Sequence, residues 1–227
     1  MNIINIEHIS KLFGDKLIFD DASFGLQEGD KVGIVGINGT GKSTLLRIVA
    51  GDETPDSGQI IRQNNLKMAY LPQTPEFEEG TTVLRAAIAD NVNELNQWTI
   101  EADARSMLNQ LGFYDYDEKV EHMSGGQKKR IALVNALLTP ADILILDEPT
   151  NHLDIASREW VEAAIEEFEG VLLFVSHDRY FIRQVARSVL IFENNAAFYY
   201  PFGYEHYLER RNSCEKKRHR YLLPHIT

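Results

Sequence analysis

Short apolar blocks alternate with segments of helical periodicity along most of this chain. Residues Ile143–Leu146 and Val171–Val175 are apolar throughout, as strands must be when a sheet is covered on both faces. The residues between them, from about 155 to 168, have helical spacing. This strand–helix–strand order is typical of parallel strands joined by a crossover helix. The pattern therefore predicts an α/β fold with a mostly parallel core sheet.

The remaining elements are predicted from shorter patterns. Residues 3–9 alternate in part and predict an edge strand, and residues 52–58 predict a loop. Further strands are expected at 19–26, 30–35 and 67–71, and a hairpin of 188–192 with 196–200 around Asn194-Asn195. Helices are expected at 44–50, at 126–138 and, as a pair, within about 82–111.

The segment Gly36–Ser43, with the sequence GINGTGKS, fits the phosphate-loop pattern G-x-x-x-x-G-K-[ST] between a predicted strand and a predicted helix. Its glycines allow successive backbone N–H groups to point into one concavity, and the helix N-terminus adds partial positive charge. Lys42 can reach the β and γ phosphates, and the Ser43 hydroxyl can ligate Mg²⁺. We interpret the segment as a nucleoside triphosphate site.

Polar residues follow three of the predicted strands. Asp147 and Glu148 end one buried strand, where Asp147 can hold Mg²⁺ and Glu148 can activate or position a water. His177 follows the next strand, at the sheet edge where active-site groups gather, and could contact a γ-phosphate. Gln73 follows a third strand and could ligate Mg²⁺ or orient the water. Alone, the carboxylate pair or the histidine would more often be structural, and Gln73 would be uninterpretable.

A second glycine-containing helix start lies at Ser124–Gln127, with the sequence SGGQ. Its hydroxyl and glycines can cradle an anion as a phosphate loop does. A single mononucleotide fills only one such cradle. We therefore expect the second one to serve a nucleotide held by another copy, in a head-to-tail pair with two ATPs at the interface.

Composition narrows the class of protein further. The 227 residues carry a net charge of −11. They include one cysteine, so an internal disulfide is ruled out, and this fits the reducing cytoplasm. No stretch approaches the roughly 18 apolar residues that a membrane helix needs, and the first residues lack a secretory signal pattern. Residues 209–227 hold six Lys or Arg and two Glu, so this tail could touch RNA phosphates or could be a solvated helix end.

In their order along the chain, these motifs resemble the nucleotide-binding domain of ATP-binding cassette (ABC) ATPases. The resemblance implies ATP and Mg²⁺ as ligands, a helical subdomain at about 75–138, adenine stacking on Phe13, and Asp154 at a dimer interface. We expect nucleotide contacts from Phe13, Gly36, Ile37, Asn38, Gly39, Thr40, Gly41, Lys42, Ser43, Thr44, Ser124, Gly125, Gly126 and Gln127. The expected Mg²⁺ ligands are Ser43, Gln73 and Asp147, and the expected catalytic groups are Lys42, Gln73, Glu148 and His177.

The segments 148–154 and 176–181, with the sequences EPTNHLD and SHDRYF, look like the ABC-F class. That class implies two cassettes in one chain, no membrane domain, and a role on the ribosome in translation or antibiotic resistance. Residues 3–203 match one cassette, and 204–227 resemble the start of a basic linker helix. We therefore expect a fragment or truncated product that pairs with a second ABC ATPase domain, as a homodimer or with the missing half.

Two other functions stay open at this point. A transport ATPase subunit would share the same core and would dock on a membrane protein. A nucleotide-binding scaffold without turnover is the other alternative, because a monomer lacks the second cradle.

Overall fold

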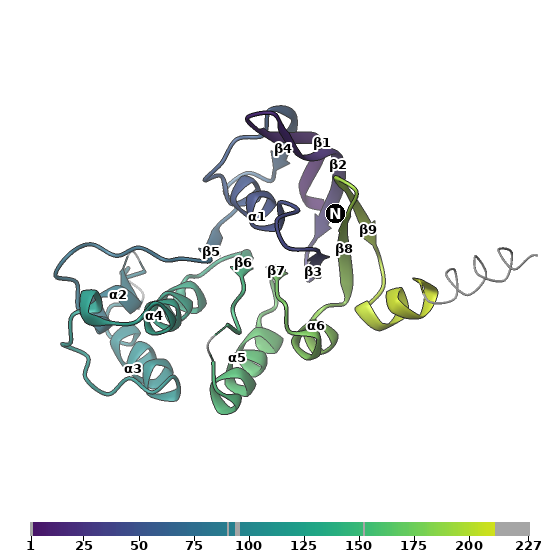
Figure 1. The fold of residues 1–227 in the computed structure, drawn as a ribbon. Coiled ribbons are helices and arrows are strands. Elements are labelled where there is room, and N and C mark those ends of the chain that lie inside the picture. The colour runs from purple at the N-terminus through teal and green to yellow at the C-terminus, as the bar shows by residue number, and fades with distance from the viewer. Residues whose placement is uncertain (1, 90, 94–95, 152, 212–227) are drawn as a thin grey trace, which may run out of the picture.

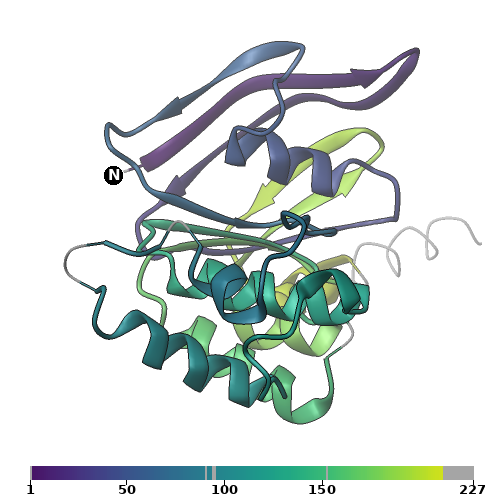
Figure 2. The same cartoon turned by 90° about the vertical axis from the view of Figure 1, so that its left-hand side faces the viewer.

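The computed structural model describes residues 2–89, 91–93, 96–151 and 153–211. Its elements form layers: a three-stranded sheet, helix α1 (Lys42–Ala50), a six-stranded sheet, and the remaining helices (Figure 1). A view from the side shows α1 between the two sheets, with the other helices on the far face of the larger sheet (Figure 2). The α/β class predicted from the sequence is confirmed.

The six-stranded sheet has the order β5-β6-β7-β3-β8-β9. Its strands are β3 (Lys31–Gly36), β5 (Met68–Leu71), β6 (Ile143–Asp147), β7 (Val171–Val175), β8 (Ser188–Glu193) and β9 (Ala196–Tyr200). All neighbours pair in parallel except β8 and β9, which form the expected hairpin with Asn194 and Asn195 at positive φ. Every residue of β6 and β7 is buried. The carboxyl ends of β3, β5, β6 and β7 therefore lie at one edge of the sheet.

The three-stranded sheet is antiparallel and has the order β2-β1-β4. Strand β1 (Asn2–Phe13) lies at its centre, between β2 (Lys16–Gln27) and β4 (Ser57–Arg62), so the prediction of an edge strand at residues 3–9 is wrong. The predicted loop at 52–58 also ends too late, because β4 begins at Ser57. Most of β4 is exposed, so its sequence lacks the alternation of a half-buried strand. Pairing with β1 is what makes this segment extended.

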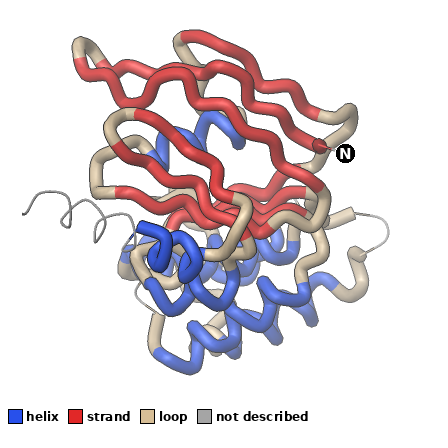
Figure 3. Tube along the Cα trace, turned by 90° about the vertical axis from the view of Figure 1, so that its right-hand side faces the viewer, coloured by secondary structure: helices blue, strands red, loops and turns tan. Residues whose placement is uncertain are grey.

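Two hydrophobic cores lie on opposite faces of the larger sheet. Leu173 of β7 belongs to the core that includes α1 and the antiparallel sheet, whereas Phe174 belongs to the core beneath the other helices. Adjacent residues of one strand reach both cores because side chains alternate across a sheet. Figure 3 shows this separation, with the strands above and most helices below.

The helices on the second face fall into two groups (Figure 1). Helices α2 (Val83–Ile88), α3 (Ile100–Gln110) and α4 (Gly125–Leu138) contact one another, and the short 3₁₀ turn η1 (Val120–His122) leads into α4. Helices α5 (Ile155–Glu167) and α6 (Arg179–Val185) also contact each other. The seven residues of α6 were not predicted, since two turns give too little periodicity to detect.

The chain is helical again over residues 204–211. The Tyr200 hydroxyl and His206 Nδ1 lie 2.6 Å apart, and the Tyr200 ring contacts Tyr207 edge-on, which fixes the start of this helix against β9. The predicted division into a cassette at 3–203, a helical subdomain at 75–138 and a linker start at 204–227 stays a prediction. Residues 212–227 lie outside the described part of the chain.

Candidate nucleotide site

The phosphate loop joins β3 to α1 and its backbone conformation depends on glycine. Gly39 and Gly41 adopt φ of 78° and 96°, which side-chain-bearing residues rarely do. A Cβ on Gly41 would lie 2.1 Å from Ile18 Cγ2, and one on Gly36 would lie 2.7 Å from Phe192 Cβ. The N-cap residue of α1 is Gly41, which has no side chain to cap the first turn. The first N–H groups of the helix therefore lack the usual N-cap acceptor, which fits a phosphate group at this position.

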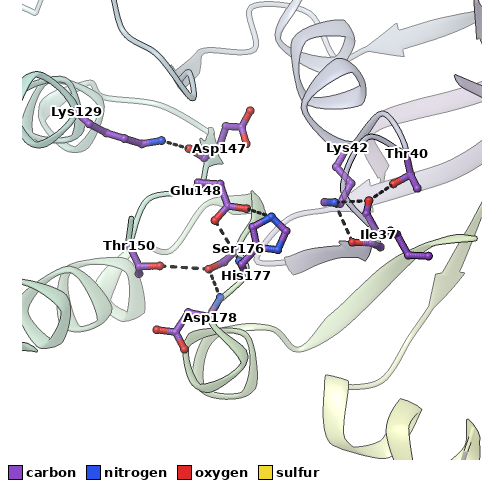
Figure 4. Close-up of polar contacts among 11 residues, drawn as sticks. Ile37, Thr40, Lys42, Lys129, Asp147, Glu148, Thr150, Ser176, His177 and Asp178 are labelled. Carbon is purple, nitrogen blue, oxygen red and sulfur yellow. Dashed lines mark hydrogen bonds and ion pairs between the residues drawn. The ribbon is translucent and has the colours of Figure 1, made fainter. Parts of the chain in front are cut away.

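Lys42 is the first residue of α1, and its side chain turns back over the loop. Its ammonium donates to the carbonyl oxygens of Gly36 and Ile37, each at 2.9 Å (Figure 4). Burial lowers the pKa of Lys42, while the nearby Glu148 and Asp147 carboxylates act in the opposite direction. The ammonium is therefore poorly hydrated, so an anionic phosphate would be a strong partner for it.

Asp147 ends β6 beneath the loop and is almost fully buried. Its Oδ1 has no hydrogen-bond partner among the described residues, and burial raises the pKa of its carboxyl despite a hydrogen-bonding contact with the Ser43 side chain. A buried carboxylate oxygen without a partner beside a hydroxyl fits a divalent cation that prefers oxygen ligands. Within the described ranges, no three His, Cys, Asp or Glu side chains are grouped as metal ligands. A Mg²⁺ ion here would depend on one carboxylate and on neutral or phosphate oxygens.

Glu148 has an unusual backbone conformation. Six non-glycine residues have positive φ among those described, and Glu148, at 56°, is the buried one. The left-handed conformation costs about 1–2 kcal/mol for such a residue. The Glu148 N–H donates to the Val175 carbonyl at 2.9 Å, which holds this turn against β7. Strain of this kind at the end of a buried strand is typical of functional sites.

The Glu148 carboxylate contacts His177, the second residue after β7. The His177 backbone N–H donates to Oε2 at 3.1 Å, and His177 Nε2 lies 3.2 Å from Oε1 (Figure 4). Burial raises the pKa of Glu148, while His177 opposes the shift. A carboxyl group with a raised pKa is a better proton acceptor once it is ionised. The His177 side chain is 53% exposed, so it can also contact a bound molecule.

A hollow of about 460 Å³ brings most of the predicted site together. Its lining comes from residues far apart in the sequence: Phe13, Ile18, Asn38, Gly39, Gly41, Lys42, Ser43, Thr44, Gln73, Glu148, Val175 and His177. Phe13 is half exposed at its rim, as an aromatic platform for a base should be. Gly36, Ile37, Thr40 and Asp147 were predicted at this site but do not line the hollow. The Thr40 hydroxyl donates to the Ile37 carbonyl, and the Ile37 side chain faces solvent.

The second predicted cradle opens into a separate hollow of about 640 Å³, lined by residues 124–130, 73–75 and Asn151. Ser124 caps α4: its Oγ accepts from the Gln127 N–H at 3.3 Å, and Gln127 Oε1 accepts from the Ser124 N–H at 3.0 Å. A Cβ on Gly125 would meet no atom within 4 Å. Gln73 lines both hollows, so it lies between the phosphate loop and this cradle.

Lys129 is a site residue that sequence reasoning missed. It is buried in α4, and its ammonium donates to the Asp147 and Gln73 carbonyls at 2.6 and 3.2 Å. Burial lowers the pKa of Lys129. The sequence does contain one indication that Lys129 is buried. It lies four residues before Leu133, which places it on an apolar side of the helix.

The model of the ABC transporter family matches residues 19–151. The chain belongs to this family. The phosphate loop and the cradle at Ser124 both fall within the matched segment. Among the residues that the structure describes, no helix combines the length and apolar character that crossing a membrane requires.

Curated relatives are similar over almost the whole chain. ABC transporter F family member 5 from Arabidopsis thaliana is 36% identical over 95% of this chain and 31% of its own length. The energy-dependent translational throttle protein EttA from Mycobacterium tuberculosis is 32% identical over 92% of this chain and 44% of its own length. The resemblance to the ABC-F class is confirmed by these relatives. The chain spans 31 to 44% of the length of the first curated relatives that it matches.

A solved structure of the archaeal ribosome recycling factor aABCE1, in complex with the archaeal ribosomal stalk protein aP1, has the same fold. It is 30% identical with a TM-score of 0.76, over 94% of this chain and 42% of that one. The fold class is thus supported by sequence and by architecture.

Proposed function

We propose that this chain binds ATP with Mg²⁺ and hydrolyses it at a site completed by a second cassette, as part of a ribosome-associated factor of the ABC-F class. The observation that carries the proposal is the presence of two phosphate-cradling helix N-termini in separate hollows of one chain. The ATPase part rests on the family match and on the geometry around Glu148. The ribosomal part rests on the relatives.

The residues of the first hollow suit the parts of ATP. Phe13 at the rim would support the adenine, and the backbone of Gly39, Gly41, Lys42 and Ser43, which lines the hollow, would bind the phosphates. Lys42 exchanges its two carbonyl acceptors for phosphate oxygens, which are stronger partners because they are charged. Phosphoryl transfer depends mainly on such positioning and charge neutralisation.

Ser43, Asp147 and Gln73 would hold the Mg²⁺ ion. When bound, the ion neutralises phosphate charge. Glu148 accepts the proton of the attacking water, and the contacts from His177 fix the carboxylate in place. His177 also presents its exposed ring to the γ-phosphate.

The cradle at Ser124 needs a second cassette. It opens into its own hollow rather than into the one that holds Lys42, so it acts on a nucleotide bound by another domain. A head-to-tail pair places each cradle on the partner's nucleotide. Asp154 caps α5 within the chain by accepting from the Ser157 N–H at 2.8 Å, and its exposure also leaves it available at such an interface.

Phosphate release measured against protein concentration tests the shared site. We expect the rate per chain to rise with concentration and then to level off as pairs form. A constant rate per chain would show that one chain suffices. ATP binding without release at any concentration would instead favour a nucleotide-binding scaffold.

The ribosomal role is supported by two similar proteins, the translational throttle protein EttA and the archaeal ribosome recycling factor aABCE1. A ribosomal partner would place the chain in the cytoplasm. Sedimentation of the chain with ribosomes in the presence of ATP tests this part. Recovery with a membrane fraction in place of ribosomes would favour a transport ATPase subunit.

A further inference from the structure

Lys129 joins three parts of the candidate site that are far apart in the sequence. It lies about one helical turn from Ser124, so it moves with the cradle at the start of α4. Its ammonium donates to the main-chain carbonyl of Asp147 at 2.6 Å (Figure 4). It also donates to the main-chain carbonyl of Gln73 at 3.2 Å. Only 5% of the residue is exposed, so water cannot replace these bonds readily.

We propose that Lys129 is a positioning residue for ATP hydrolysis, which sets the places of Asp147 and Gln73 relative to each other and to the α4 cradle. The inference rests on the function proposed above. Lys129 bonds the carbonyl of Asp147 and leaves its Oδ1 without a partner. The main chain is thereby fixed while the carboxylate is free to take a ligand.

A second buried lysine, Lys31, has bonding partners that indicate a purely structural role. Lys31 is also 5% exposed, and its ammonium donates to the Ile165 and Glu166 carbonyls at 3.1 and 2.9 Å. Those acceptors belong to the last turn of α5, where carbonyls lack the usual i+4 partner, although the Ile165 carbonyl also accepts from the Phe168 N–H at 3.3 Å. The acceptors of Lys129 instead follow or end two strands at the proposed nucleotide site. Lys31 therefore provides a matched control with the same burial and the same number of bonds.

Loss of the Lys129 ammonium leaves the Asp147 and Gln73 carbonyls without their shared donor. Their segments can then shift relative to each other and to α4. A misplacement of about 1 Å can cost on the order of 10² in rate even when the substrate still binds. We therefore expect a lower kcat and a smaller gain in ATP affinity from Mg²⁺. The affinity of the phosphate loop for ATP without Mg²⁺ should not change.

The test compares Lys129→Met with Lys31→Met in the full chain. The dissociation constant for ATP is measured by equilibrium binding in EDTA and in Mg²⁺, and kcat and KM are measured from phosphate release. For Lys129→Met we expect affinity in EDTA within about twofold of wild type, loss of most of the gain in affinity that Mg²⁺ gives, and a kcat at least about tenfold lower with little change in KM. Lys31→Met should keep the Mg²⁺ gain and kcat.

The inference is overturned if Lys129→Met keeps both the Mg²⁺ gain and kcat, or if Lys31→Met loses them to the same extent. Lys129→Gln, whose amide can still donate to one carbonyl, is measured by the same criteria in case Lys129→Met does not fold. The ATP-binding measurements also distinguish the positioning role of Lys129 from the proposed ATPase activity. Wild-type protein that binds ATP with Mg²⁺ but releases no phosphate contradicts the proposed ATPase, while the Mg²⁺ gain still decides the role of Lys129.

Discussion

The His177 backbone N–H donates to Glu148 Oε2 at 3.1 Å across the ends of two neighbouring strands. The His177 ring Nε2 lies 3.2 Å from Oε1, which has no hydrogen-bond partner among the described residues. The backbone hydrogen bond, together with the left-handed backbone of Glu148, positions the carboxylate before any ligand arrives. A preorganised base of this kind loses little energy to rearrangement during reaction.

Replacing Glu148 with glutamine should separate binding from turnover. The amide oxygen can still accept from the His177 N–H, so the fold and ATP affinity should change little. The amide cannot take a proton from water, so kcat should fall by about 10² to 10⁴. Binding of ATP and release of phosphate are measured on the same preparation.

Glu193→Gln is the control for that change, because Glu193 is an exposed glutamate at the end of β8. It should match wild type in both measurements. Turnover by Glu148→Gln at the wild-type rate would remove Glu148 from the role of base.

Buried strands and ligand-binding turns could be predicted from the sequence, since both leave local signals. Strands β6 and β7 are apolar at every position except Asp147, because both of their faces are covered. The phosphate loop needs glycine where φ is positive, so its backbone conformation can be inferred from the positions of its glycines. Parallel pairing then brings Gln73, Asp147 and His177 to one edge of the sheet.

Features that depend on distant partners could not be predicted in this way. Strand β4 is mostly exposed and is extended because β1 lies beside it, and β1 is central for the same reason. Glu148 adopts a positive φ because the Val175 carbonyl and His177 hold it. The position of Lys129 four residues before Leu133 indicates an apolar side of the helix, but the two carbonyls that accept its bonds lie on distant segments and leave no local signal.

Gly41→Ala tests how far the phosphate loop depends on glycine. The methyl group would meet Ile18 Cγ2 at 2.1 Å and would also force alanine to a φ of 96°. We expect a loss of about 1–2 kcal/mol in the free energy of unfolding from the backbone and a further loss of about 1–3 kcal/mol from the contact. ATP affinity should fall as well, because the first turn of α1 must shift.

Gly112→Ala is matched to that variant. Gly112 has a φ of 82°, but no atom lies within 4 Å of the position of its Cβ. It should lose only the backbone contribution and keep wild-type ATP affinity. Urea unfolding and equilibrium binding measure both quantities, and equal losses in the two variants would contradict the packing argument.

Glu162 should make stability depend on pH. Burial raises the pKa of this carboxyl, Asp178 adds to the shift, and Oε1 has no hydrogen-bond partner. The folded protein therefore binds more protons than the unfolded chain between the ordinary carboxyl pKa of about 4.3 and the raised one, so this group lowers stability as pH rises through that window. Glu162→Gln should raise the melting temperature at neutral pH, and the difference should shrink below about pH 4.

Glu76→Gln is the control for this change, because Glu76 is an exposed glutamate. It should leave the melting temperature unchanged across the same pH range. A Glu162→Gln variant that is less stable than wild type at neutral pH would show that the charge is favourable where it lies.

Two inactive variants should restore activity to each other if cassettes share their sites. Lys42→Ala removes the phosphate contact on one side. Gly125→Asp places a negative charge in the Ser124 cradle, where the open position and the helix N-terminus tolerate it. Each variant alone should release little phosphate. In a mixture, a pair with one copy of each variant has one intact site, so an equal mixture should reach about a quarter of the wild-type rate if pairs form at random. A mixture no faster than its two components would mean that the cradle and the phosphate loop do not meet across an interface between copies.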